Sequence, residues 1–212
     1  MKPEELYLRM KKDAAKISDP SLGASLDAQI DIMYNLLTDS RGDARIDHLT
    51  QLPNYKQLLE TLESITAHSQ RTGEALVLGF VDLNELKVYN DTYGHVQANH
   101  AIRKAAETIK GSLRTQDFLA RYGGDEFCFI LPSTNLEGAK SVVERIKKNV
   151  DSLSIDAVVD TLPDNNYRRV SLSAGVTELR EREDYMLALN RANQAMITSK
   201  SNSKTISSVT YV

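Results

Sequence analysis

The stretch Arg121-Tyr122-Gly123-Gly124-Asp125-Glu126-Phe127 separates two apolar runs, at residues 118–122 and 127–131. Two adjacent glycines between runs rich in aromatic and branched residues are typical of a tight β-hairpin. Because glycine permits a positive φ and has no side chain, a bulky anionic ligand can approach the backbone of such a turn. Two carboxylates beside it repel a bare phosphate, but they can hold a divalent cation that in turn holds the phosphate. Alone, the stretch also fits a solvated acidic turn, so its companions decide between the two interpretations.

Helices and strands alternate on both sides of this turn from residue 47 onward. The spacing of apolar residues predicts helices after Pro53 and around residues 102–113, 139–150 and 184–199, and strands at residues 75–82, 155–159 and 169–177. The order βααββαβ, with a hairpin in the middle, predicts an α+β domain with one mixed, mostly antiparallel sheet flanked by helices. Neither a P-loop nor a dinucleotide-binding fingerprint is present in the sequence.

The first 46 residues form a separate unit in this interpretation, an N-terminal helical extension ahead of a domain at residues 47–212. Its apolar residues recur at spacings of four and three, so they lie on one stripe of a helix. These residues are Leu22, Leu26, Ile30, Met33 and Leu37. The residues around Pro20 interrupt the pattern and predict the start of a second helix. The stripe can pack on the domain or on its copy in a second chain, so we expect a role in dimerisation or in signalling.

The composition narrows the classes of partner and compartment. The chain has 212 residues and a net charge of −3, which does not favour nucleic-acid binding or a polybasic membrane anchor. The longest apolar run, residues 75–81, is far shorter than the ~20 residues of a membrane-spanning helix, and the N-terminus has no signal-peptide core. We therefore expect a cytoplasmic protein without membrane insertion, in which the single cysteine, Cys128, is a buried apolar residue.

A second carboxylate, Asp82, closes the apolar run at residues 75–81. Burying this charge unpaired would be costly, so we expect Asp82 to emerge at the edge of the sheet, although aspartate is also a favoured helix N-cap. If this strand lies beside the hairpin, Asp82 and Asp125 meet at one end of the sheet. Two carboxylates with a nearby backbone carbonyl suit Mg²⁺ or Mn²⁺, and Lys87 is placed to reach a phosphate over the same edge.

Four motifs in this order resemble those of the GGDEF-family diguanylate cyclases, over residues 45–205. D-H-L-T-Q-L-P-N at residues 47–54 is similar to the family's D-x-L-T-G-L-x-N. The segment D-L-N-E-L-K-V-Y-N-D-T-Y-G-H at residues 82–95 is similar to D-[IL]-D-x-F-K-x-[IY]-N-D-x-[YF]-G-H. Residues 121–127 carry the signature itself, and S-A-G-V at residues 173–176 resembles the S-x-G-[VI] strand. The resemblance implies the palm-like fold of nucleotidyl cyclases.

The family chemistry implied by this resemblance joins two GTP molecules at a homodimer interface into cyclic di-GMP and releases two pyrophosphates. By the same resemblance, two Mg²⁺ or Mn²⁺ ions per active site are held by Asp82, the backbone carbonyl of Leu83, and Asp125. Glu126 assists metal binding or accepts the proton, and Lys87 neutralises developing charge. The family implies substrate contacts from Asn90, His95, Asn99, Leu86, Gly123, Gly124, Lys200 and Lys204. Lysine at 204 replaces the family's arginine, which keeps the charge but loses the bidentate fork.

A product-inhibition site is implied as well. Arg114-Thr115-Gln116-Asp117 matches the family's R-x-x-D motif, and Arg145 lies where a supporting arginine is often found. An arginine fork and a carboxylate can together bind a guanine edge or a phosphate. Alone, an R-x-x-D in a loop would be a surface ion pair, and its position ahead of the hairpin favours the inhibitory site for cyclic di-GMP.

Departures from the family pattern leave two alternatives open. Ala98-Asn99 replaces the usual Gly-Asp, and a mismatched amide against guanine costs about 1–3 kcal/mol. An amide at 99 can instead pair with adenine, so a cyclase that uses ATP or makes mixed products is one alternative. Further replacements are Asn84, Leu86, Gln51, Tyr55, Asn193 and Ile197. Together they keep a second alternative open, a degenerate module that binds a cyclic dinucleotide without turnover.

Overall fold

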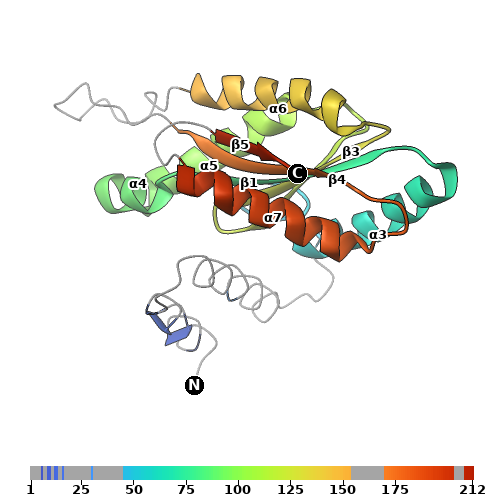
Figure 1. Cartoon of the computed structure of the whole chain (residues 1–212). Coiled ribbons are helices and arrows are strands. Elements are labelled where there is room, and N and C mark those ends of the chain that lie inside the picture. Colours follow the sequence, from blue (N-terminus) through green and yellow to red (C-terminus); the bar gives the residue numbers. More distant parts are fainter. Residues whose placement is uncertain are drawn as a thin grey trace.

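The computed structural model describes residues 45–153, 170–202 and 208–212, together with residues 6, 9–10, 12–13, 16 and 30. The strand predicted at residues 155–159, Lys204, and most of the predicted apolar stripe lie outside the described residues; of that stripe only Ile30 is described, as helical and buried. The described part has a five-stranded sheet with helices on both faces (Figure 1). This architecture confirms the predicted fold class.

The sheet has the order β2-β3-β1-β4-β5. Its strands are β1 (Leu76–Leu83), β2 (Phe118–Gly123), β3 (Glu126–Pro132), β4 (Leu172–Glu178) and β5 (Ser208–Tyr211). The central strand β1 pairs antiparallel with β3 and with β4, and β2 pairs antiparallel with β3. Only the β4–β5 pair is parallel in the described sheet. The strand β5 was not predicted, because its four residues are too few to show a periodic pattern.

Helices cover the sheet on both sides. They are α3 (Tyr55–Thr72), α4 (Leu86–Tyr93), α5 (His95–Gly111), α6 (Leu136–Asp151) and α7 (Tyr185–Asn202). Alternate residues of β1 point to opposite faces: Val77 and Val81 pack with α5 and α6, whereas Leu78 and Phe80 pack with α3 and α7. All eight residues of β1 are buried, which explains why the strand reads as a continuous apolar run.

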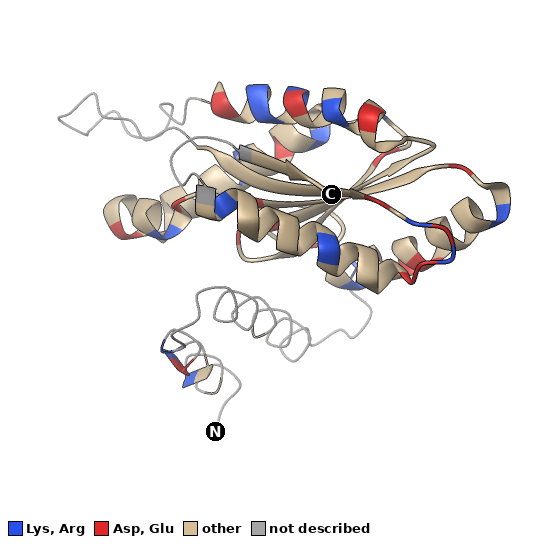
Figure 2. Ribbon diagram, viewed as in Figure 1, with Lys and Arg blue, Asp and Glu red and all other residues tan. Residues whose placement is uncertain are grey.

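Side-chain caps and ion pairs account for the helix boundaries and the exposed surface. Asn54 accepts a hydrogen bond from the backbone N–H of Gln57 and begins α3, and Asn135 begins α6 in the same way. Acidic and basic residues alternate along α6 (Figure 2), where Lys140 pairs with Glu137 over 2.6 Å. Within the described residues, no helix combines the length and apolar character needed to cross a membrane.

The glycine at position 175 brings α7 unusually close to β4. A Cβ at Gly175 would lie 2.1 Å from the backbone oxygen of Ala192 and 2.2 Å from the backbone nitrogen of Met196. A separation below 3 Å would require the helix backbone to move, so only glycine allows this packing. Because Lys200 lies on the same helix, the glycine also fixes how near that lysine comes to the sheet.

Candidate active site at the sheet edge

The predicted hairpin is confirmed. Strands β2 and β3 pair antiparallel, with a register shift between Arg121 and Gly123 at the turn. The left-handed conformation falls on Gly124, with φ of 47°, and Gly124 is exposed whereas Gly123 is buried. The turn therefore presents a backbone without a side chain at the end of the sheet, which is the property that close approach of an anionic ligand requires.

The two predicted carboxylates converge at this end. Asp82 lies opposite Glu126 in the β1–β3 register. The backbone N–H of Leu83 donates to the backbone oxygen of Asp125 over 3.2 Å, so the last residues of β1 and the hairpin turn are joined directly. Forty-three positions separate Asp82 from Asp125 in the chain, and sheet pairing brings them to one edge.

Asp82 is buried, contrary to the expectation that it emerges from the sheet. Its residue surface is 4% exposed, and the ammonium group of Lys200 donates to its Oδ1 over 2.7 Å. The expectation was wrong because it treated the carboxylate as unpaired, whereas a lysine 118 positions away pairs with it. Asp82 is not a helix N-cap either, since α4 begins after Glu85 and has no side-chain cap.

Electrostatics at the edge reflect the crowding of carboxylates. Burial, together with the negative charge of Asp125, raises the pKa of the Asp82 carboxyl to about 7, and Lys200 opposes this shift. Burial alone would lower the pKa of Lys200, but Asp82, followed by Asp125 and Glu126, outweighs burial and raises it. The carboxylates of Asp82, Asp125 and Glu126 therefore favour the charged form of Lys200.

The donor set at this edge fits a hard cation that brings ligands of its own. Asp82 and Asp125 supply carboxylate oxygens, the electrostatic crowding marks a place where positive charge is stabilised, and Leu83 adds a backbone carbonyl at the same strand end. Among the described residues, no group of three or more His, Cys, Asp or Glu side chains could hold a metal ion, so a metal at this edge would take further ligands from outside the protein. The arrangement therefore suits a metal bound together with phosphate oxygens or water, as is usual for Mg²⁺.

The predicted nucleotide-contacting residues flank this edge on α4 and α5. Lys87, His95 and Asn99 are exposed, whereas Leu86 is partly buried against the core. The side-chain oxygen of Asn90 is buried and accepts no hydrogen bond from the described residues. An amide oxygen in this state is available to a donor from a ligand, because leaving it unpaired costs stability. Lys204 lies outside the described residues.

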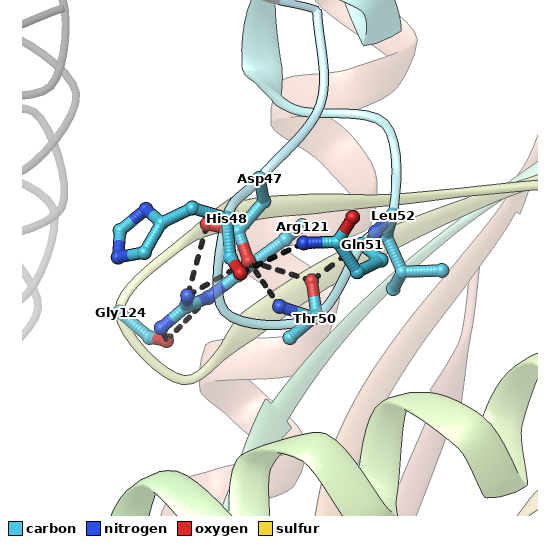
Figure 3. Close-up of polar contacts among 7 residues, drawn as sticks. All are labelled: Asp47, His48, Thr50, Gln51, Leu52, Arg121 and Gly124. Atoms are coloured by element: carbon cyan, nitrogen blue, oxygen red, sulfur yellow. Dashed lines mark hydrogen bonds and ion pairs between the residues drawn. The ribbon is translucent and has the colours of Figure 1, made fainter.

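One residue pair that the sequence interpretation did not assign holds the hairpin turn. The Arg121 guanidinium donates to the Gly124 backbone oxygen from Nε (3.0 Å) and from a second nitrogen (2.6 Å). It also donates to both Asp47 carboxylate oxygens at 3.0 Å (Figure 3). Asp47 also accepts hydrogen bonds from the backbone N–H and the hydroxyl of Thr50. The ion pair is largely buried: the side chain of Arg121 is 13% exposed and that of Asp47 is 15% exposed. Opposite charges in the 47–54 motif and in the hairpin signature were the signal that could have revealed this clamp.

A second network fixes the other side of the β1 end. The Asn84 amide donates to the Ser171 hydroxyl over 2.9 Å, and the Ser173 hydroxyl donates to the Asn84 amide oxygen over 2.7 Å. The backbone N–H of Asn84 also donates to the Ser171 backbone oxygen. All three side chains are buried, and the network satisfies both ends of the amide that stands where the family pattern has aspartate.

The predicted inhibitory residues lie together at the opposite end of β2. The Asp117 carboxylate accepts from the backbone N–H of Arg114 over 2.8 Å, which closes a turn and leaves the Arg114 side chain exposed. Arg145 donates twice to the backbone oxygen of Ser112, two residues before this turn. The structure brings the three residues to one region but shows no side-chain pair between Arg114 and Asp117 among the described contacts.

Sheet, hairpin and acidic edge define the class: an α+β domain of the palm-like type with carboxylates gathered at one end of the sheet. The model of one family, "Diguanylate cyclase, GGDEF domain", matches residues 44–205. The chain belongs to this GGDEF-domain family. It is 31% identical over 83% of its length to diguanylate cyclase DgcP of Pseudomonas aeruginosa, and 33% identical over 69% to diguanylate cyclase A of Treponema denticola. The chain spans 25% and 38% of those proteins, respectively.

Solved structures agree with this placement. The coiled coil and GGDEF domain of DgcB from Caulobacter crescentus, in complex with c-di-GMP, superposes with a TM-score of 0.73 at 28% identity. That match covers 89% of this chain and 96% of the DgcB chain. Diguanylate cyclase SiaD from Pseudomonas aeruginosa, in complex with its activator SiaC, superposes with a TM-score of 0.72 at 30% identity. That match covers 99% of this chain and 75% of the SiaD chain.

Proposed function

We propose that this chain is a diguanylate cyclase, which condenses two GTP molecules into cyclic di-GMP and releases two pyrophosphates. The observation that carries the proposal is the meeting of Asp82 and Asp125 beside an exposed glycine turn. In the reaction, the 3′-hydroxyl of each GTP attacks the α-phosphate of the other, and pyrophosphate leaves. Each of two protomers holds one GTP, so the active form is a homodimer.

Bound at this edge, two Mg²⁺ or Mn²⁺ ions would supply Lewis-acid stabilisation of the attacking and leaving oxygens. Asp82, Asp125 and the backbone oxygen of Leu83 would hold them, with Glu126 assisting. The exposed Gly124 has no side chain, so its turn lets the triphosphate approach the backbone.

The chain's other residues bind and orient the substrate. Lys87 is exposed on the first turn of α4, where its charge can offset that of a phosphate. The unpaired amide oxygen of Asn90 is suited to accept from the guanine base. Glu126 is placed next to the metal ligands, where it can accept the proton of the attacking hydroxyl.

The experiment that tests the activity is pyrophosphate release from GTP with Mg²⁺ by the Asp125→Ala variant. We expect a loss greater than the roughly 10–100-fold cost of disturbing residues that only support a metal ligand. Glu63→Ala, an exposed carboxylate on α3, serves as the matched control and should keep full activity. Circular dichroism checks that both variants fold. Full activity of Asp125→Ala would refute the metal assignment, and tight binding of cyclic di-GMP by a wild-type chain without turnover would favour the binding-module alternative.

Base choice is tested at Asn99, which is exposed on α5. Incubation with GTP or ATP separately, followed by chromatography of the products, distinguishes cyclic di-GMP from adenine-containing products. If the amide weakens guanine binding, Asn99→Asp should lower the KM for GTP by about tenfold, equal to 1.4 kcal/mol. A KM that does not change would show that Asn99 has no part in base recognition.

Product inhibition is proposed for Arg114, Asp117 and Arg145. The supporting observation is the exposed Arg114 guanidinium beside a turn that Asp117 and Arg145 hold in place. Arg114→Ala should raise the concentration of cyclic di-GMP needed for half inhibition without changing the initial rate. Arg103→Ala, an exposed arginine on α5, is the control.

A further inference from the structure

The ion pair between Lys200 and Asp82 occupies one of the proposed metal ligands. The Lys200 ammonium lies 2.7 Å from Oδ1 of Asp82, whose side chain is only 6% exposed, whereas the Lys200 side chain is 41% exposed. Asp82 is fixed by the buried strand β1, and Lys200 extends from near the end of α7 on a flexible stem. The lysine is therefore the partner that can move.

Charge explains why the pair forms. A buried carboxylate without a partner is strongly unfavourable, and here a second carboxylate, Asp125, adds repulsion. Lys200 lies in the combined field of Asp82, Asp125 and Glu126. A divalent cation bound to the same carboxylates would lie in the same field, and the two cations would repel each other at this separation.

Resting on the proposed cyclase function, we propose that Lys200 is a displaceable cation that occupies the place of the metal at Asp82 until a metal–nucleotide complex arrives. Metal binding breaks the Lys200–Asp82 pair, and the released ammonium group turns to the triphosphate that enters with the metal. Metal and nucleotide thereby bind together: the metal alone must displace the lysine, whereas the metal with GTP offers the lysine a new anionic partner.

This exchange predicts opposite effects of removing the lysine on two binding measurements. Lys200→Met should bind Mn²⁺ alone more tightly than the wild type, because the competing ion pair is gone. A pair that is formed in about nine of ten molecules lowers the apparent metal affinity about tenfold. The same variant should bind a non-hydrolysable GTP analogue with Mn²⁺ more weakly, because a phosphate partner has been removed.

The experiment is an equilibrium titration of the full chain with Mn²⁺, followed by electron paramagnetic resonance of the free ion at one fixed pH, with and without the GTP analogue. Lys140→Met, an exposed lysine on α6, is the matched control and should behave as the wild type in both titrations. Lys200→Gln is the second variant, used if Lys200→Met does not fold. Its amide can still donate a hydrogen bond to Asp82 but carries no charge, so the same rise in Mn²⁺ affinity is expected.

A third variant separates this inference from the proposed function. Asp82→Asn should lose Mn²⁺ binding if Asp82 is a metal ligand. If Asp82→Asn loses Mn²⁺ binding but both Lys200 variants bind Mn²⁺ no more tightly than the wild type, the displacement of Lys200 is refuted and the metal site is supported. Unchanged Mn²⁺ affinity in Asp82→Asn would refute the metal site itself.

Discussion

At the scale of single residues, the buried pair of Asp47 and Arg121 links the start of the domain to the hairpin that carries Asp125 and Glu126. The guanidinium contacts the Gly124 carbonyl and the Asp47 carboxylate at once, so it fixes the turn relative to the segment before α3. Burial would raise the pKa of Asp47, but Arg121 and the hydrogen bonds from Thr50 outweigh burial and lower it below 3.8. The ionised form is therefore the one that stabilises the fold.

Asp47→Asn should lower the free energy of unfolding by about 1–3 kcal/mol at pH 7, since it leaves the buried guanidinium without its counter-charge. Because the folded-state pKa of Asp47 is depressed, its contribution is present above the ordinary value of 3.8 and is lost as the pH falls through the lower folded value. The difference between wild type and variant should accordingly shrink at pH 3. Urea unfolding at both pH values measures it.

Glu60→Gln is the matched control for this prediction. Glu60 pairs with Arg45 over 2.9 Å, but these side chains are 42% and 44% exposed. Exposed pairs contribute about 0–1 kcal/mol, so the control should lose little at either pH. An Asp47→Asn variant that loses no more than Glu60→Gln would contradict the structural role of the clamp.

At the scale of elements, the approach of α7 to β4 decides whether Lys200 can reach the sheet edge. Gly175→Ala places a methyl group against the α7 backbone. It should lower the free energy of unfolding by about 3 kcal/mol or more, at the upper end of the usual cost of overpacking. The cost is high because a helix backbone cannot rotate away as a side chain does. Thermal and urea unfolding measure the loss. Activity should fall as well, since Lys200 moves with its helix.

Gly111→Ala is the control for this substitution. Nothing lies within 4 Å of a Cβ at Gly111, the last residue of α5, so alanine there should be neutral or stabilising by up to about 1 kcal/mol. If both alanine variants are equally stable, the close contact of α7 with β4 is not a constraint on this fold.

At the scale of the whole molecule, the first contacts of the described domain and the start of the family match lie one residue apart. The backbone oxygen of Arg45 accepts from the N–H of Asn54, and Ile46 forms a β-bridge with Pro53, so residues 45 and 46 already belong to the domain. The predicted boundary between residues 46 and 47 stays a prediction, as does the dimerising role of the preceding segment. The family match from residue 44 favours a boundary just ahead of that residue.

Residues 45–212 expressed alone should fold cooperatively, because the core clusters lie within this range. If the first 44 residues bring two protomers together, the shorter chain should lose activity on dilution more steeply than the full chain, and it should recover at high concentration. Initial rates over a hundredfold range of protein concentration, with sedimentation velocity, measure this. Identical concentration dependence of the two chains would contradict the dimerising role.

Local pattern was enough to predict the hairpin, the buried strand β1 and the apolar faces of the helices, because each depends on periodicity within one element or on a short turn. The convergence of Asp82 with Asp125 was expected only if β1 lies beside the hairpin, and the structure supplies that long-range pairing of β1 with β3. The strand β5 has four residues and pairs in parallel with β4, so its existence depends on long-range contacts that no local pattern contains.

The sequence by itself determined the family, the fold class and which carboxylates share the sheet edge, because motif order and strand periodicity are written in consecutive residues. Only the tertiary structure decided how the charges are partnered: Asp82 is buried against Lys200, 118 positions away, and Arg121 holds Asp47 across 74 positions. The physical reason is that the cost of a buried charge depends on which opposite charge folding places beside it, and that choice is made by packing between distant elements.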